Sequence, residues 1–175
     1  KAQHLVLPGV GAFHKGMKAL QELELTKTII KTANRGVPLI GICLGMQMLL
    51  DESDEFEVTD GLGLISGRVE KFPEIKEKNN YIKIPQINWH EIVPGISNIS
   101  WKNSLLKEHM STDSLYFVHS FVARPSNVNH ILANYNCYGI KIPALIIKDN
   151  IIGCQFHPEK SGDAGLKILK NFMSM

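Results

Sequence analysis

The chain has 175 residues, of which 44% are hydrophobic and 21% are charged, and its formal net charge is +2. This length suffices for one domain with a full core, and the composition is typical of globular proteins. The small net charge and the scattered lysines argue against a nucleic-acid-binding surface. No apolar run approaches the ~20 residues that a membrane helix needs. We therefore expect one domain over residues 1–175, with neither nucleic acid nor membrane as a partner.

The cysteines and the first residue add two expectations. Cys43, Cys137 and Cys154 are odd in number and lack CxxC spacing, which argues against a disulfide framework or a zinc site. This pattern suits the reducing cytoplasm, and we expect no metal and no cofactor. The sequence begins with Lys1 and runs at once into an apolar stretch, so we expect the natural protein to be longer at this end.

The first third of the chain alternates between strand-like and helix-like patterns. Residues 5–7 form an apolar run that ends in a Pro-Gly turn, and apolar residues then recur at helical spacing over 17–33. Residues 37–42 indicate a second strand, and residues 46–51 a second helix. This alternation predicts an α/β fold, with a mostly parallel sheet flanked by helices in three layers, as in flavodoxin-like proteins.

The remainder predicts a smaller antiparallel portion and a closing helix. Residues 61–72 indicate short strands and turns, 74–81 a solvated loop, and 115–118 and 131–135 two further strands. Residues 144–152 form a predicted hairpin. The amphipathic stretch 164–172 predicts a last helix, with Ser161 or Asp163 available to cap it.

Cys43 lies between two glycines in Gly41-Ile42-Cys43-Leu44-Gly45, at a predicted strand-to-helix junction. Such a junction holds a nucleophile in a strained elbow, and flanking glycines allow neighbouring chain to pass closely. The start of the following helix favours thiolate over thiol. A buried, inert cysteine is the commoner case, and that interpretation is kept for Cys137 and Cys154.

A histidine and a glutamate follow the last predicted strand in His157-Pro158-Glu159. Residues two apart in an extended segment face the same side, and the proline disfavours the helical region for the residue before it. Glu159 can then orient one imidazole nitrogen while the other serves Cys43 as a base. Either nitrogen can take either role, and a His-x-Glu pair alone is as readily a surface feature.

Acyl chemistry at a cysteine also needs amide donors for the tetrahedral oxyanion. The Leu44 N–H directly follows the nucleophile, and the Val10 N–H in the Pro-Gly loop is a second candidate, although the glycines there also suit a simple turn. Gln47 lies one helical turn beyond Cys43 and shares its side. It either binds a polar substrate or lies solvated on the helix surface.

Laid out in this way, the chain resembles class I glutamine amidotransferases. The matching stretches are LPGVGAF, GICLGMQML, GLGLISGRV, YFVHSF and CQFHPEKSG, in that order along nearly the whole chain. Within this family it is most similar to the glutaminase subunits of imidazole glycerol phosphate synthases, which act in histidine biosynthesis. The family usually has a strand and helix ahead of LPGVGAF, a unit that is absent here.

The resemblance implies a role for each matching residue. Cys43, His157 and Glu159 would form the triad that hydrolyses glutamine through a thioester, with Val10 and Leu44 at the oxyanion. The glutamine pocket would be lined by Gly11, Gln47, His119 and Ser120. The ammonia would pass to a synthase partner of (β/α)₈-barrel type in a heterodimer, with Trp89, Tyr116 and Lys160 near the interface.

Two departures keep alternatives open. The stretch Pro85-Gln86-Ile87-Asn88-Trp89-His90 differs from the family's usual Pro-His-x-Gly-Trp-Asn, and Phe121 stands where a tyrosine is usual. A glutaminase that serves a surface-polysaccharide sugar amidotransferase is therefore an alternative, as is a non-catalytic regulatory subunit. A γ-glutamyl hydrolase is a third possibility, which the HPEKSG context disfavours.

Overall fold

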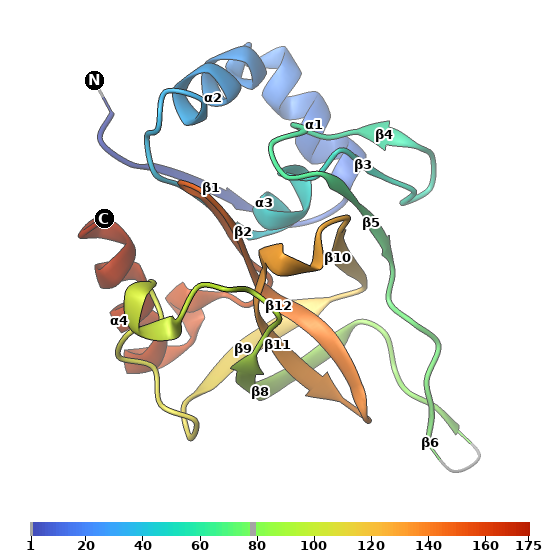
Figure 1. Ribbon diagram of the computed structural model, residues 1–175. Coiled ribbons are helices and arrows are strands. Elements are labelled where there is room, and N and C mark those ends of the chain that lie inside the picture. The colour runs from blue at the N-terminus through green and yellow to red at the C-terminus, as the bar shows by residue number, and fades with distance from the viewer. Residues whose placement is uncertain (1, 78–79) are drawn as a thin grey trace.

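A seven-stranded mixed sheet organises the computed structural model, which describes residues 2–77 and 80–175 (Figure 1). Its strands, in spatial order, are β1 (Leu5–Gly9), β2 (Leu39–Cys43), β13 (Ile151–Cys154), β12 (Ile140–Lys148), β11 (Ile131–Cys137), β8 (Gln86–Pro94) and β9 (Ser114–His119). The pairs β1–β2 and β2–β13 are parallel. All pairs from β13 to β9 are antiparallel.

The α/β class is confirmed, but the antiparallel share of the main sheet is larger than the sequence predicted. Tight turns explain part of the difference, because the consecutive strands that they join must run in opposite directions. Tyr138 and Gly139 link β11 to β12, both with positive φ, and Asp149 (φ 53°) links β12 to β13. The second of these turns is the hairpin predicted over 144–152.

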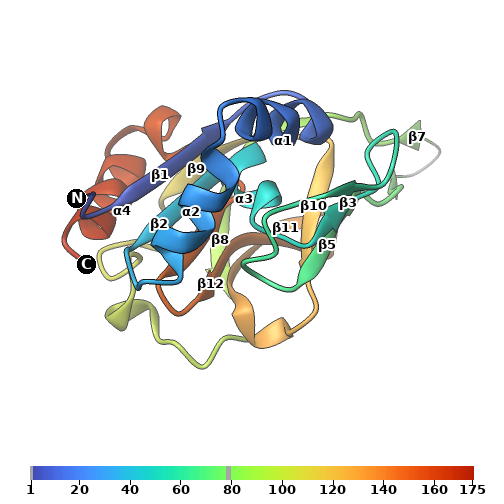
Figure 2. The ribbon, with the colours of Figure 1, turned by 90° about the horizontal axis from the view of Figure 1, so that it is seen from above.

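Helices cover both faces of this sheet. The helices are α1 (Phe13–Glu22), α2 (Leu25–Ala33), α3 (Leu44–Met48) and α4 (Gly162–Met173). Leu39 of β2 packs into the cluster that holds Phe13 of α1, whereas its neighbour Ile40 packs with Phe172 of α4. Figure 2 shows α1 and α2 apart from α4 across the strands. Within the described ranges, no helix is long and apolar enough to cross a membrane.

The helical stretch predicted over 17–33 is two helices instead of one. Glu24 adopts a left-handed conformation (φ 55°), which interrupts the helical hydrogen bonds between α1 and α2. The prediction that Ser161 or Asp163 caps α4 through its side chain is also wrong. Ser161 occupies the N-cap position, but its hydroxyl makes no capping bond.

A smaller sheet lies beside the main one. Its strands, in spatial order, are β10 (Phe121–Pro125), β5 (Gly67–Lys71), β3 (Glu52–Ser53) and β4 (Thr59–Asp60). Of the short strands predicted over 61–72, only β5 forms. The predicted loop 74–81 contains the paired strands β6 (Lys76–Glu77) and β7 (Asn80–Tyr81), and residues 78–79 lie outside the described residues. Three short 3₁₀ helices, η1 (Trp101–Asn103), η2 (Val128–His130) and η3 (Pro158–Lys160), complete the described elements.

Candidate active site

Cys43 occupies a strained elbow, as predicted. It ends β2 with φ 54° and ψ −109°, directly before α3. A Cβ on Gly45 would lie 1.8 Å from the Leu7 carbonyl oxygen, and one on Gly41 would lie 2.5 Å from the Gly45 carbonyl oxygen. Both glycines are therefore required by the close passage of neighbouring backbone, and the elbow presents Cys43 at the carboxyl end of the parallel strands.

A cavity of about 300 Å³ opens above this elbow. Its walls come from the loop after β1, from α3, from the segment before β8, and from the end of β9 and the start of β10. They also include a loop residue after β3 and the turn after β13. They consist of Val10, Gly11, Cys43, Leu44, Gln47, Glu55, Pro85, Val118, His119, Ser120, Phe121 and His157. The predicted nucleophile and base thus share one cavity with all the residues predicted for the oxyanion and the glutamine pocket.

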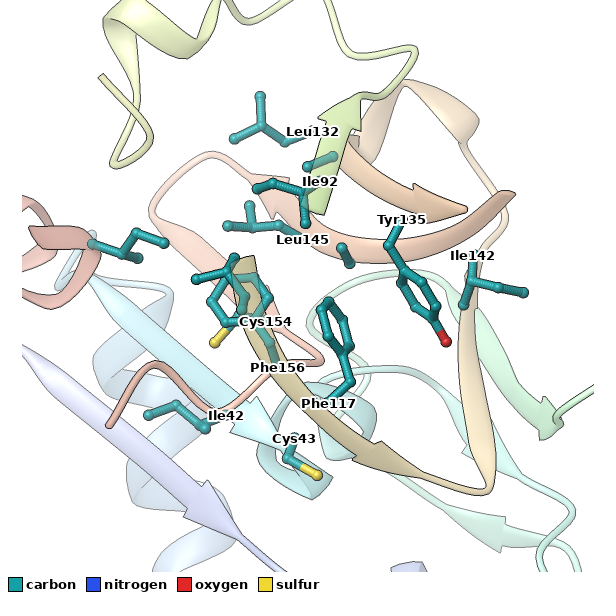
Figure 3. Packing of buried hydrophobic residues seen from close by; sticks show 14 of the residues in the cluster. Ile42, Cys43, Ile92, Phe117, Leu132, Tyr135, Ile142, Leu145, Cys154 and Phe156 are labelled. Carbon is teal, nitrogen blue, oxygen red and sulfur yellow. The ribbon is translucent and has the colours of Figure 1, made fainter. Parts of the chain in front are cut away.

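Cys43 is largely buried, although it lines the cavity. Figure 3 shows the residue at the margin of the apolar cluster that includes Ile42, Phe117 and Phe156. Its Sγ lies 3.8 Å from the Val118 carbonyl oxygen and 3.8 Å from Gln155 Nε2. Burial raises the pKa of this thiol from 9.0 to about 11, and this outweighs the Leu44 N–H, which lowers it.

The start of α3 favours the thiolate, as expected, but burial has the larger effect on the pKa of Cys43. The helix α3 spans only five residues, so its dipole is small, whereas the sulfur has lost most of its water. Burial thus favours the thiol form of Cys43. Cys154 and Cys137 are also buried thiols, and burial raises the pKa of each, in agreement with a structural role.

His157 and Glu159 make the predicted contact, and the structure assigns the two ring nitrogens. His157 Nδ1 lies 2.7 Å from Glu159 Oε1, so Nδ1 carries a proton and donates it to the carboxylate. His157 Nε2 is buried, and no group in the described part of the chain bonds to it. His157 also lines the cavity that holds Cys43, so Nε2 is the candidate base nitrogen.

The local backbone differs from the predicted extended segment. His157 is extended, with φ −99° and ψ 94°, but the next three residues form η3. The Lys160 N–H donates to the His157 carbonyl oxygen at 3.0 Å, which closes this turn. The His157–Glu159 contact therefore arises from a tight turn instead of a continued strand.

Two buried carboxamides, those of Gln47 and Gln155, form a hydrogen-bonded chain that leads to the Cys43 sulfur. Gln47 Nε2 donates to the Phe121 carbonyl oxygen and to Gln155 Oε1, both at 3.1 Å. Because a carbonyl only accepts, this pairing fixes the orientation of both amides and directs Gln155 Nε2 at Cys43. Gln47 itself lines the cavity, and its Oε1 remains an acceptor. Gln155 was missed, and a lone polar residue in the apolar run 151–156 was the available signal.

His119 lines the cavity, as expected, but both of its ring nitrogens bond to groups of the protein. Its Nδ1 lies 2.8 Å from the Phe121 carbonyl oxygen, so Nδ1 donates, and its Nε2 accepts from the Tyr135 hydroxyl at 2.9 Å. Burial lowers the pKa of this imidazole to about 4. Both ring nitrogens of a neutral His119 are thus used within the protein, and the residue shapes the wall without a free polar atom on its ring.

Glu55 is a second lining residue that the sequence did not single out. Its Oε2 accepts from the Phe13 N–H at 2.7 Å, which places a carboxylate at the first turn of α1 and at the cavity rim. The stretch from Asp51 to Glu57 reads as an ordinary acidic loop, so no local pattern marks this one carboxylate.

The residues predicted for a partner interface lie outside the cavity but next to it. Trp89 of β8 is 52% exposed and pairs in register with Tyr116 of β9, with the two rings 5.6 Å apart. Tyr116 is half-buried, and its ring centroid lies 6.4 Å from that of His157. Lys160 is exposed on η3. Trp89 and Tyr116 are therefore neighbours on β8 and β9, and Lys160 lies on the turn that follows His157.

Comparisons with known proteins agree with this geometry. Residues 2–175 match the family model described as "Glutamine amidotransferase class-I". The "Imidazole glycerol phosphate synthase subunit HisH 1" of Legionella pneumophila (strain Lens) is 47% identical over 99% of this chain and 82% of that protein. The "Imidazole glycerol phosphate synthase subunit HisH" of Geobacillus sp. (strain WCH70) is 42% identical over 99% of this chain and 79% of that protein.

Solved structures agree at the level of the fold. A "Crystal structure of glutamine amidotransferase" aligns over 98% of this chain and 79% of its own, with a TM-score of 0.63 at 19% identity. The "Structure of PurLQS from Thermotoga maritima" aligns over 97% of this chain and 78% of its own, with a TM-score of 0.62 at 18% identity. The matched family model, the close relatives and the elbow cysteine lead to one conclusion: the chain belongs to the class I glutamine amidotransferase family.

Proposed function

We propose that this chain is the glutaminase subunit of an imidazole glycerol phosphate synthase in histidine biosynthesis. It hydrolyses glutamine to glutamate and ammonia and delivers the ammonia to its synthase partner. One observation carries the chemistry: Cys43 on its strained elbow shares a cavity with His157, whose Nδ1 is bound to Glu159 while Nε2 is unoccupied. The family and the names of the relatives support the substrate and the pathway.

The reaction proceeds in two acyl-transfer steps. The Cys43 sulfur attacks the side-chain amide carbon of glutamine while His157 Nε2 takes the thiol proton. The tetrahedral intermediate collapses, the carbon–nitrogen bond breaks, and the imidazolium returns its proton to the leaving nitrogen, which departs as ammonia. Water then attacks the thioester with His157 as base, and glutamate leaves with the thiol restored.

The timing of the first proton transfer follows from burial. Because burial raises the pKa of the Cys43 thiol, it disfavours ionisation before substrate arrives. The proton moves to His157 during the attack, and the Glu159 carboxylate stabilises the imidazolium that forms. The Gln155 N–H, aimed at the sulfur, favours the developing thiolate on the other side.

We infer that two backbone amides bind the oxyanion. The Leu44 N–H follows the nucleophile directly and lies close enough to lower the pKa of its thiol. Val10, 79% exposed, lines the same cavity from the loop after β1. That loop lies against the start of α3, because a Cβ on Gly9 would be 3.1 Å from the Gly45 nitrogen. Amide donors from both segments would meet the charge that develops on the carbonyl oxygen.

The cavity also offers partners for the amino-acid end of glutamine. The Glu55 carboxylate and Gln47 Oε1 are acceptors that suit the α-ammonium group. Gly11 and Ser120 line the remaining wall, and a Cβ at Gly11 meets no atom within 4 Å, so space remains there. His119 holds this wall in place through Phe121 and Tyr135.

The partner contacts the surface formed by Trp89, Tyr116 and Lys160, and we infer that it is a (β/α)₈ barrel in a heterodimer. An exposed tryptophan beside a tyrosine, with the two rings tilted by 60°, suits an interface centre. The relatives' names favour this synthase over an enzyme that amidates surface-polysaccharide sugars. We place the reaction in the cytoplasm because three unpaired thiols suit a reducing compartment.

The test is glutamate release by the full-length protein, measured alone and with its co-purified synthase subunit. Cys43→Ala is expected to abolish both rates, whereas Cys137→Ala, which removes a buried thiol that contacts Gln86, leaves them near wild type. A γ-glutamyl adduct should be trapped on the Cys43 peptide of the wild type, and no adduct should be found in Cys43→Ala. Wild-type turnover by Cys43→Ala would refute the mechanism, and a partner that forms no imidazole glycerol phosphate with glutamine would refute the pathway.

A further inference from the structure

Ser161 occupies the N-cap position of α4, but its hydroxyl does not cap the helix. A serine at a helix N-cap normally accepts a hydrogen bond from the backbone of the first turn. At the start of α4 the Ser161 hydroxyl makes no such bond, although the side chain is buried. Instead, it donates to the His157 carbonyl oxygen at 2.6 Å and accepts from the Tyr116 N–H at 2.9 Å. The serine therefore serves the strand–turn junction and not the helix end.

These bonds close a ring between two segments. The His157 N–H donates to the Tyr116 carbonyl oxygen at 2.9 Å, so both backbone polar groups of Tyr116 are bound to the His157–Ser161 turn. Strand β9 is the edge strand of the main sheet at this point. Its outward-facing groups at Tyr116 are thus satisfied by the turn that carries the imidazole, and the Ser161 hydroxyl is the only side chain in the ring.

We propose that Ser161 is a positioning residue for His157 that ties its imidazole to the main chain of Tyr116, beneath the expected partner surface. This inference rests on the proposed function of the same site, because it gives His157 the role of base. The contact between His157 Nδ1 and Glu159 Oε1 constrains the ring, but both residues belong to the same turn. The Ser161 hydroxyl adds a side-chain link between that turn and strand β9 of the main sheet, beside the backbone bond from His157 to Tyr116.

The arrangement also connects the partner surface to the base. Tyr116 pairs with the exposed Trp89, and its ring lies 6.4 Å from that of His157. A partner that seats on these two side chains restrains the Tyr116 backbone, and through Ser161 it restrains the His157 carbonyl. Docking then reduces the freedom of the base without touching it, and the rate gain on partner binding depends on the Ser161 hydroxyl.

The test compares Ser161→Ala with Ser104→Ala in the full-length protein, alone and with its synthase subunit. Ser104 is a matched control, because its hydroxyl also donates to a carbonyl, that of Trp101 at 2.9 Å, and accepts an N–H, that of Leu106 at 3.1 Å. Ser161→Ala should lower kcat for glutamine hydrolysis by about tenfold to a hundredfold with KM little changed, as for a displaced catalytic group. The gain in rate on partner addition should shrink as well, and Ser104→Ala should alter neither.

A second readout does not require turnover. The short His157 Nδ1–Glu159 contact should give a low-field proton signal in the NMR spectrum, which broadens or disappears in Ser161→Ala and persists in Ser104→Ala. If Ser161→Ala does not fold, Ser161→Cys keeps the volume with a weaker hydrogen-bonding group and should show a smaller loss. Unchanged kcat and an unchanged signal in the folded Ser161 variants would overturn the inference. Wild-type turnover by Cys43→Ala would instead refute the proposed function, and the NMR result would still stand.

Discussion

The protonation of Cys43 can be tested by raising the pH and following its alkylation. Burial raises the pKa of this thiol from 9.0 to about 11, so the folded protein holds the proton until the solution is strongly alkaline. A difference of two pH units corresponds to about 3 kcal/mol, or about a hundredfold smaller thiolate fraction than in an ordinary cysteine at neutral pH. The iodoacetamide reaction of free protein should therefore rise with pH and reach its midpoint near 11.

The assay follows the Cys43 peptide by mass spectrometry between neutral pH and the highest pH at which the protein stays folded. Cys43→Ala gives the background from Cys137 and Cys154, which are also buried. The midpoint is the diagnostic quantity, because limited access slows the reaction equally at every pH. A midpoint below about 8 would show that Cys43 has the lowered pKa of a reactive catalytic cysteine and is already a thiolate near neutral pH. That result would refute the argument from burial.

Two further predictions concern stability, both measured by urea denaturation. Gly45→Ala should destabilise the fold by several kcal/mol or prevent folding, since its Cβ would lie 1.8 Å from the Leu7 carbonyl oxygen. Gly139→Ala, with φ +85° and no atom within 4 Å, should cost only about 1–2 kcal/mol of backbone strain, and equal costs for the two would contradict this account. For His119, burial lowers the pKa from 6.5 to about 4, so the unfolded chain takes up the proton first as the pH falls. About 3 kcal/mol of stability should then be lost between pH 6.5 and 4, and His119→Gln should remove that loss; the same pH dependence in both proteins would show that another group is responsible.

The central chemistry could be predicted from the sequence because it is encoded in short segments. Glycines on either side of Cys43 signal the elbow, and the proline between His157 and Glu159 signals a constrained pair. In both cases neighbouring residues determine the local backbone, so a window of five residues carries the information. The hairpin after β12 was predictable for the same reason, since Asp149 and Asn150 are typical turn residues.

The features that were not predicted depend on contacts between distant segments. Gln155 points at the sulfur only because Gln47 and the Phe121 carbonyl fix its amide, and these residues lie on three different elements. The protonation of Cys43 depends on the total burial of the elbow, which no local pattern reports. The Ser161 hydroxyl likewise bonds across 45 positions to Tyr116, where sequence rules favour a helix cap.

The parallel pairing of β2 with β13 places Ile42 opposite Cys154, so the two segments that supply nucleophile and base leave the sheet at the same level. Main-chain hydrogen bonds maintain this alignment, and nearly any amino acid can form them. These main-chain bonds set one part of the reactive geometry, and the glycines of the elbow and the Ser161 hydroxyl supply another part. A scaffold of this kind can acquire a different acceptor enzyme through substitutions on its outer surface, while its active site still produces ammonia.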